Sequence, residues 1–140
     1  MKTTKPISLF ILTLIISACS SLKDNADNKL FNTTWKLEFL SGPIITFSTL
    51  YPNNKPIIKF NQTTNKAEGT DSCNGYISDY TLNETDISFG EPGPSTMMFC
   101  GQGEKIFRDA IRKINKYKID QDGKLNLMID DVIMMRFRKS

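Results

Sequence analysis

The chain of 140 residues contains no histidine. Histidine is the base of Ser–His–Asp triads and the most common protein ligand of zinc, so these catalytic and metal-binding arrangements are excluded. The sequence also lacks a glycine-rich phosphate loop and a Gly-x-Ser-x-Gly elbow, which excludes the usual sites of nucleotide-binding proteins and α/β-hydrolases. No apolar run approaches the roughly 20 residues of a stable membrane-spanning helix.

What is present is typical of one small globular domain. Hydrophobic residues make up 39% of the chain and charged residues 24%, a balance that favours a folded chain over a disordered one. Nine Phe, four Tyr and one Trp provide enough aromatic volume for a core. The length allows one such domain and is too short for two well-packed ones.

The first residues have the features of an export signal. Lys2 and Lys5 form a basic start, and residues 7–16 are mostly apolar. The run ends in Ile16-Ser17-Ala18-Cys19, which resembles the bacterial lipobox, whose cysteine is acylated and becomes the new N-terminus. The alternative is an ordinary secretory signal with an incidental cysteine. We expect residues 1–18 to be a lipoprotein signal peptide, residues 19–29 a polar tether lipidated at Cys19, and residues 30–140 the domain.

This processing predicts the location and limits the partners. Acyl chains on Cys19 would hold the protein at a membrane of the cell envelope. Ser20 after the cysteine favours the outer membrane, following the sorting rule of proteobacterial lipoproteins. The sequence leaves open whether the domain faces the periplasm or the cell surface. Loss of Lys2 and Lys5 lowers the formal net charge from +3 to +1, which leaves no basic field to attract nucleic acid. We expect a monomer.

Two cysteines remain once Cys19 is assigned to lipid. Cys73 and Cys100 in an oxidising envelope compartment predict a disulfide. In the chain-entropy model, closing a loop of this length stabilises the domain by ~3–4 kcal/mol. The alternative is a Cu(I) site in which Met97 and Met98 add thioether ligands.

Alternating apolar and polar residues predict strands about ten residues apart. Trp35, Leu37 and Phe39 would share the buried face of a first strand at residues 33–40. Residues 44–54 are ambiguous between a weak strand and a turn. Further strands are expected at residues 57–60, 66–70, 76–82, 85–89, 117–121, 124–129 and 132–138. The spacing indicates an antiparallel meander.

One helix interrupts this series. Apolar residues recur between Gly103 and Asn115 at the spacing of a single buried stripe. Its other face carries Lys105, Arg108, Asp109 and Arg112, and we interpret it as solvated surface. Turns at Asp122-Gly123 and Asp130-Asp131 would connect the last three strands. The expected centre of the core is Trp35, Phe60, Phe107, Leu127 and Phe137.

The middle of the chain carries ordered motifs. They are Ser72-Cys73-Asn74-Gly75-Tyr76, Tyr80, Thr96-Met97-Met98-Phe99-Cys100, and Glu104 with Phe107 on the helix. With a first strand containing Trp35-Lys36-Leu37, they resemble the META domain of HslJ-like bacterial lipoproteins over roughly residues 29–138. The resemblance implies an α+β fold whose antiparallel strands curl into a small, partly open barrel with one helix packed across it. It also implies a stress-associated envelope lipoprotein without an established enzymatic activity.

The family motif includes Asn74, Tyr76, Tyr80, Thr96, Met98 and Glu104. We interpret it as structural: Asn74 would bond its own backbone in a tight turn, and Tyr76 and Tyr80 would close one end of the barrel. A disulfide could tie this loop to the segment before the helix. The competing interpretation makes the loop a recognition surface. Ser72, Ser78, Met97 and Phe99 depart from the pattern of the family.

No group of residues forms a recognisable active site. Asp130 and Asp131 are adjacent but lie at an expected turn, where both carboxylates point to water. We therefore expect no enzymatic activity, no cofactor and no metal, and favour a protein that binds another protein or an envelope component. The alternative is a carrier of a lipid or other apolar ligand in the barrel, with walls from Met97, Met98, Phe99, Met134 and Met135. A copper-handling protein is the third possibility.

The lipoprotein assignment is testable by metabolic labelling in a bacterial host with a clickable palmitate analogue. The wild-type protein should be labelled and Cys19→Ala should not, because the acyl chains are attached at this cysteine. An unlabelled wild type, or label retained by Cys19→Ala, contradicts the assignment.

Overall fold

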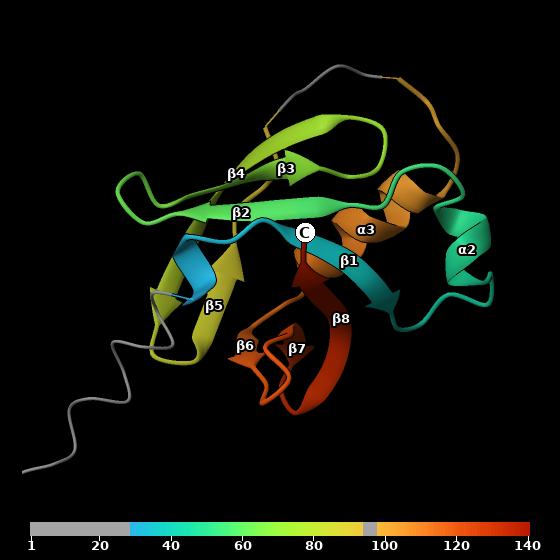
Figure 1. Ribbon diagram of the computed structural model, residues 1–140. Helices are drawn as coiled ribbons and strands as arrows, with labels where there is room; N and C mark the ends of the chain where they lie inside the picture. The colour runs from blue at the N-terminus through green and yellow to red at the C-terminus, as the bar shows by residue number, and fades with distance from the viewer. Residues whose placement is uncertain (1–28, 94–97) are drawn as a thin grey trace, which may run out of the picture.

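The computed structural model describes residues 29–93 and 98–140; Cys19, Thr96 and Met97 lie outside the described residues. Within them, eight antiparallel strands form a closed barrel in sequence order (Figure 1). The strands are β1 Trp35–Leu40, β2 Ile57–Asn61, β3 Lys66–Thr70, β4 Gly75–Asn83, β5 Asp86–Phe89, β6 Lys116–Ile119, β7 Leu125–Ile129 and β8 Val132–Lys139. Two helices, α2 Phe47–Leu50 and α3 Gly103–Ile111, and a helical turn at residues 29–31 accompany the barrel.

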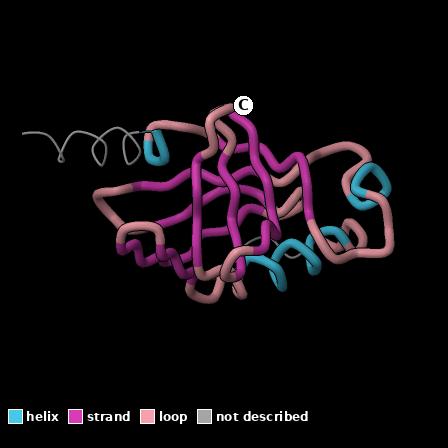
Figure 2. Tube along the Cα trace, turned by 90° about the horizontal axis from the view of Figure 1, so that it is seen from below, coloured by secondary structure: helices cyan, strands magenta, loops and turns pink. Residues whose placement is uncertain are grey.

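The barrel is closed, so the expectation of a partly open one is wrong. Strand β1 pairs on one side with β2 (Trp35↔Ile58) and on the other with β8 (Leu37↔Phe137). The seam between β5 and β6 is narrow, with one register pair. The fold is mostly β with short helices, and Figure 2 shows α3 lying across the ends of the strands. Closure removes the free edges that an open sheet would expose.

The predicted core is confirmed. Trp35, Phe107, Leu127 and Phe137 are fully buried, Phe60 is nearly so, and all five belong to one hydrophobic cluster. The indole N–H of Trp35 donates to the carbonyl oxygen of Leu30 (3.0 Å), which satisfies the polar end of a buried ring. The helical turn at residues 29–31 is thereby attached to the barrel.

The first strand differs from its predicted register. Trp35 and Leu37 face the core, but Phe39 is exposed and Leu40 is buried in its place. The pairing of β1 with β8 shifts between Leu37 and Phe39, which is a β-bulge. An extra residue in a strand turns the following side chains to the opposite face. Phe39 instead packs under the guanidinium of Arg136, 5.8 Å from the ring centroid.

The ambiguous residues 44–54 contain α2, a single turn that packs on the start of α3. Leu50 and Tyr51 are buried, and the Tyr51 hydroxyl donates to the carbonyl oxygen of Gly103 (2.9 Å). A Cβ on Gly103 would lie 2.6 Å from the Leu50 carbonyl oxygen, so this close approach requires glycine. In the described part of the chain, no helix is long and apolar enough to cross a membrane.

The remaining strands and both predicted turns are confirmed. Gly123 has a φ of +74° and donates its N–H to the Asp120 carbonyl oxygen (3.0 Å), and Asp130 has a φ of +52° in the second turn. Helix α3 is shorter than predicted and ends at Ile111, although Ile114 beyond it is still buried. On β7 and β8, Ile129 and Ile133 are half-buried.

Truncating a ring in this core should destabilise the domain strongly. Phe137→Ala removes a fully buried side chain and should lower the free energy of unfolding by ~3–5 kcal/mol, measured by urea denaturation. Ile44→Ala is the control and should change stability little, because Ile44 is a fully exposed apolar residue. Equal losses in the two variants would contradict this arrangement of the core.

Candidate functional site

A tight loop at residues 71–74 joins β3 to β4. The carboxylate of Asp71 is fully buried, and its Oδ1 accepts the backbone N–H groups of Cys73 (3.1 Å) and Asn74 (2.7 Å). The N–H of Asp71 donates to the Asn74 carbonyl oxygen (2.9 Å), which closes the loop. Ser72 lies in the left-handed region with a φ of +92°. The Asp71 side chain therefore forms the turn.

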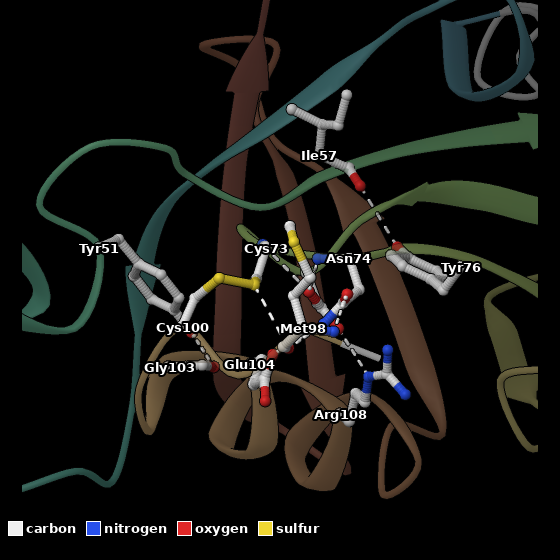
Figure 3. A network of polar contacts seen from close by, with 11 residues as sticks. Tyr51, Ile57, Cys73, Asn74, Tyr76, Met98, Cys100, Gly103, Glu104 and Arg108 are labelled. Carbon is white, nitrogen blue, oxygen red and sulfur yellow. Dashed lines mark hydrogen bonds and ion pairs between the residues drawn. A yellow bond between two sulfur atoms is a disulfide. The ribbon is translucent and has the colours of Figure 1, made fainter. Parts of the chain in front are cut away.

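Asn74 connects this loop to the segment that precedes α3 (Figure 3). Its Oδ1 accepts the N–H of Met98 (2.9 Å) and its Nδ2 donates to the Met98 carbonyl oxygen (2.8 Å). Nδ2 also donates to Oε2 of Glu104 (2.9 Å), in the first turn of α3. Sequence interpretation expected Asn74 to bond its own backbone; the turn-forming side chain is Asp71, and the carboxamide of Asn74 reaches across to Met98.

The predicted disulfide between Cys73 and Cys100 is confirmed, and Figure 3 shows it beside Tyr51. The two Cα atoms are 5.8 Å apart, within the range that a disulfide allows. The bridge and the Asn74 hydrogen bonds thus fasten two nearby residues, Met98 and Cys100, to the same loop. We call this assembly the clamp: Asp71, Cys73, Asn74, Met98, Cys100, Glu104 and Arg108.

Arg108, a member of the clamp, was expected on the solvated face of the helix. Its Nε donates to Oδ2 of Asp71 (2.6 Å), so the guanidinium neutralises a fully buried carboxylate. A buried charge is tolerated only when it is paired and hydrogen-bonded, and both oxygens of Asp71 meet this condition. The interpretation of Arg108 as solvated surface is wrong. An Asp at the start of a turn was a signal for Asp71, but nothing local indicated its partner 37 positions away.

The two motif tyrosines are buried, as predicted. The Tyr76 hydroxyl donates to the Ile57 carbonyl oxygen (3.3 Å), and its ring centroid lies 5.7 Å from that of Phe107. The Tyr80 hydroxyl donates to the Asn61 carbonyl oxygen (3.2 Å), and its ring packs edge-on against Phe60.

Burial raises the pKa of Tyr76, and the charge of Asp71 raises it further. The unfolded chain has the lower pKa, about 10. The neutral phenol therefore contributes stability that is fully present below this pH and is lost as the pH rises above it. Burial, with a smaller effect of Asp71, also raises the pKa of Tyr51, whose hydroxyl donates to the Gly103 carbonyl oxygen.

A groove of about 470 Å³ lies beside the clamp, along β2, β3 and β4. Ile57, Tyr76 and Ile77 give it apolar walls, and Gly69 and Gly75 leave part of it free of side chains. The volume is in the range of sites that bind a small apolar group.

The chemistry available in the clamp is structural. The disulfide leaves no thiolate on Cys73 or Cys100, so the Cu(I) interpretation loses its two strongest ligands. Within residues 29–93 and 98–140, no group of three or more His, Cys, Asp and Glu side chains is arranged to hold a metal. Asp71 and Arg108 are engaged with each other, and Glu104 accepts a hydrogen bond from Asn74.

These features define the class of protein as a small, closed, antiparallel β-barrel. A disulfide joins its β3–β4 loop to the segment before α3, and the buried carboxylate of Asp71 joins the same loop to Arg108 on α3. The chain belongs to the META domain family, whose model matches residues 28–140. It is also similar in fold to a protein from Burkholderia xenovorans solved by NMR. That match has a TM-score of 0.61 and 20% identity, and covers 96% of this chain and 99% of the other. The comparison with curated proteins found no match.

The ion pair between Asp71 and Arg108 should be a large contributor to stability. Arg108→Met leaves the buried carboxylate unpaired and should lower the free energy of unfolding by about 3 kcal/mol in urea denaturation. Arg112→Met is the matched control on the same helix: its ion pairs with Glu91 and Asp109 are exposed, so stability should change little. Asp71→Asn with Arg108→Met should cost less than the sum of the single changes; strict additivity would contradict the pairing.

Proposed function

We propose that the protein is a non-catalytic, stress-associated lipoprotein of the cell envelope that binds a protein or another envelope component through the surface of the clamp. The signal sequence and Cys19 support the envelope location, with the outer membrane favoured. Membership of the META domain family supports the general class.

One observation carries the binding role. Met98 and Phe99 expose 59% and 85% of their surface, yet the residues on each side of the Phe99 ring are fastened to the loop at residues 71–74. The backbone of Met98 is hydrogen-bonded to Asn74, and Cys100 is covalently linked to Cys73. An apolar side chain that is held rigid but left in water is typical of the anchors of protein interfaces, because binding then orders few additional groups.

The alternative of a carrier with its ligand inside the barrel has less support. An eight-stranded barrel is only wide enough for its own side chains or for one small ligand. In the described part of the chain, large side chains such as Trp35, Phe60 and Phe137 occupy inward positions and pack into one cluster. An apolar ligand is better accommodated by the groove outside the barrel.

The binding role is testable by photo-cross-linking in living cells. A benzophenone amino acid at position 99 of the full-length protein should give one discrete cross-linked product, identified by mass spectrometry. Position 132 is the matched control, because Val132 is an apolar residue of similar exposure to Met98 but lies far along the chain in β8. The same products from both positions, or none from position 99, would refute the clamp as a binding surface.

A further inference from the structure

Phe99 is fixed in position on both sides. Asn74 makes a hydrogen bond to the N–H of Met98 and another to its carbonyl group, and the disulfide holds Cys100. With one residue between two fastened neighbours, the Phe99 ring has little freedom beyond its own rotamers. Burying an apolar ring is favourable, and the Phe99 ring is 85% exposed in the single chain.

The groove beside the clamp offers a matching hollow. Gly69 is required by the fold, since a Cβ there would overlap the Ile57 carbonyl oxygen. Gly75 is different: the nearest atom to a Cβ at this position is 3.7 Å away, which is an ordinary contact, and its φ is not in the left-handed region. The fold does not require glycine at position 75, and the missing side chain keeps the groove open.

The residues that hold Phe99 in place are neighbours of residues that line the groove. Gly75 lines the groove, and its neighbour Asn74 holds Met98, which precedes Phe99. The groove is also lined by Lys59 and Glu68, which are opposite each other on β2 and β3. Among the described residues neither of these side chains forms an ion pair, so the groove presents one free charge of each sign.

We infer that the partner bound by the clamp surface is a second copy of this chain, with Phe99 of each copy seated in the groove of the other. The inference rests on the proposed function and names its partner. A two-fold interface uses the same patch twice, so that patch must be complementary to itself. An apolar ring beside an apolar groove, and a Lys beside a Glu, meet this requirement. This proposal differs from the sequence-based expectation of a monomer, and the experiment below decides between the two.

A membrane is a poorer match for the same ring. The segment from Met98 to Gln102 has no charged residue and so no attraction to anionic lipid. This segment, orange in Figure 1, enters α3 on the opposite side of the barrel from the turn at residues 29–31, blue, to which the tether connects. Anchoring to a common membrane would in turn raise the effective concentration of one copy for another.

Sedimentation of the mature, lipidated chain in density-matched detergent tests the dimer. The wild type should sediment as a dimer. Phe99→Ser and Gly75→Val should each weaken association by about tenfold or more, the effect expected for a central interface residue. Ile44→Ser, which changes a fully exposed apolar residue elsewhere, and Thr81→Val, on the outward face of β4 outside the groove, should not. Circular dichroism checks that each variant is folded.

A second measurement places the ring. The benzophenone amino acid at position 99, in a mixture of ¹⁵N-labelled and unlabelled chains, should give cross-links between labelled and unlabelled copies at groove residues such as Ile57 and Ile77. A wild type that remains monomeric up to about 1 mM, where even weak association is visible, overturns the inference. So does a dimer that is unaffected by both substitutions, or that cross-links outside the groove. A monomer that cross-links in cells to a different protein overturns the dimer and leaves the proposed function standing.

Discussion

The rest of the clamp depends on the hydrogen bonds and the ion pair of the buried Asp71 carboxylate. Its two oxygens serve different parts of the fold: Oδ1 holds the backbone of the loop between β3 and β4, and Oδ2 holds Arg108 on α3. Loss of either set of contacts would leave a charge in a dry environment, which costs several kcal/mol. The loop and the helix are therefore coupled, because neither can move without removing a partner from the same buried group.

The covalent and non-covalent parts of the clamp act on different states of the chain. In the chain-entropy model, the Cys73–Cys100 disulfide stabilises the domain mainly by restricting the unfolded chain. The disulfide alone does not fix the orientation of the loop. The hydrogen bonds of Asn74 exist only in the folded state, and they fix both the N–H and the carbonyl group of Met98. The disulfide adds stability, and the carboxamide of Asn74 fixes the position of the Met98 backbone in the folded state.

The features that depend on residues close in the sequence could be predicted. Alternation of apolar and polar residues predicted the strands and the burial of Trp35 and Phe137, and the turn residues Asp122-Gly123 and Asp130-Asp131 predicted the two late turns. Prediction failed where the position of a side chain depends on a residue far away in the sequence. The bulge that turns Phe39 outward is set by pairing with β8, and closure depends on that same pairing between the two ends of the domain. Arg108 had the spacing of a solvated residue, and only the folded loop places Asp71 beneath it. The disulfide was predictable because the cysteine count, together with the oxidising compartment expected from the signal sequence, limits the pairing independently of geometry.

Because the interior of the barrel is filled, a binding site is expected on its outer surface. A small domain reaches marginal stability only if its inward positions are packed, and here they hold rings and branched chains in one cluster. Interior space given to a ligand would reduce a core that has little excess. The outside carries no such constraint: the clamp holds the exposed Phe99 in place, and the groove is lined by Gly75, the neighbour of Asn74 in the clamp. The polar network that stabilises the loop therefore also determines the shape of the surface that a partner would meet.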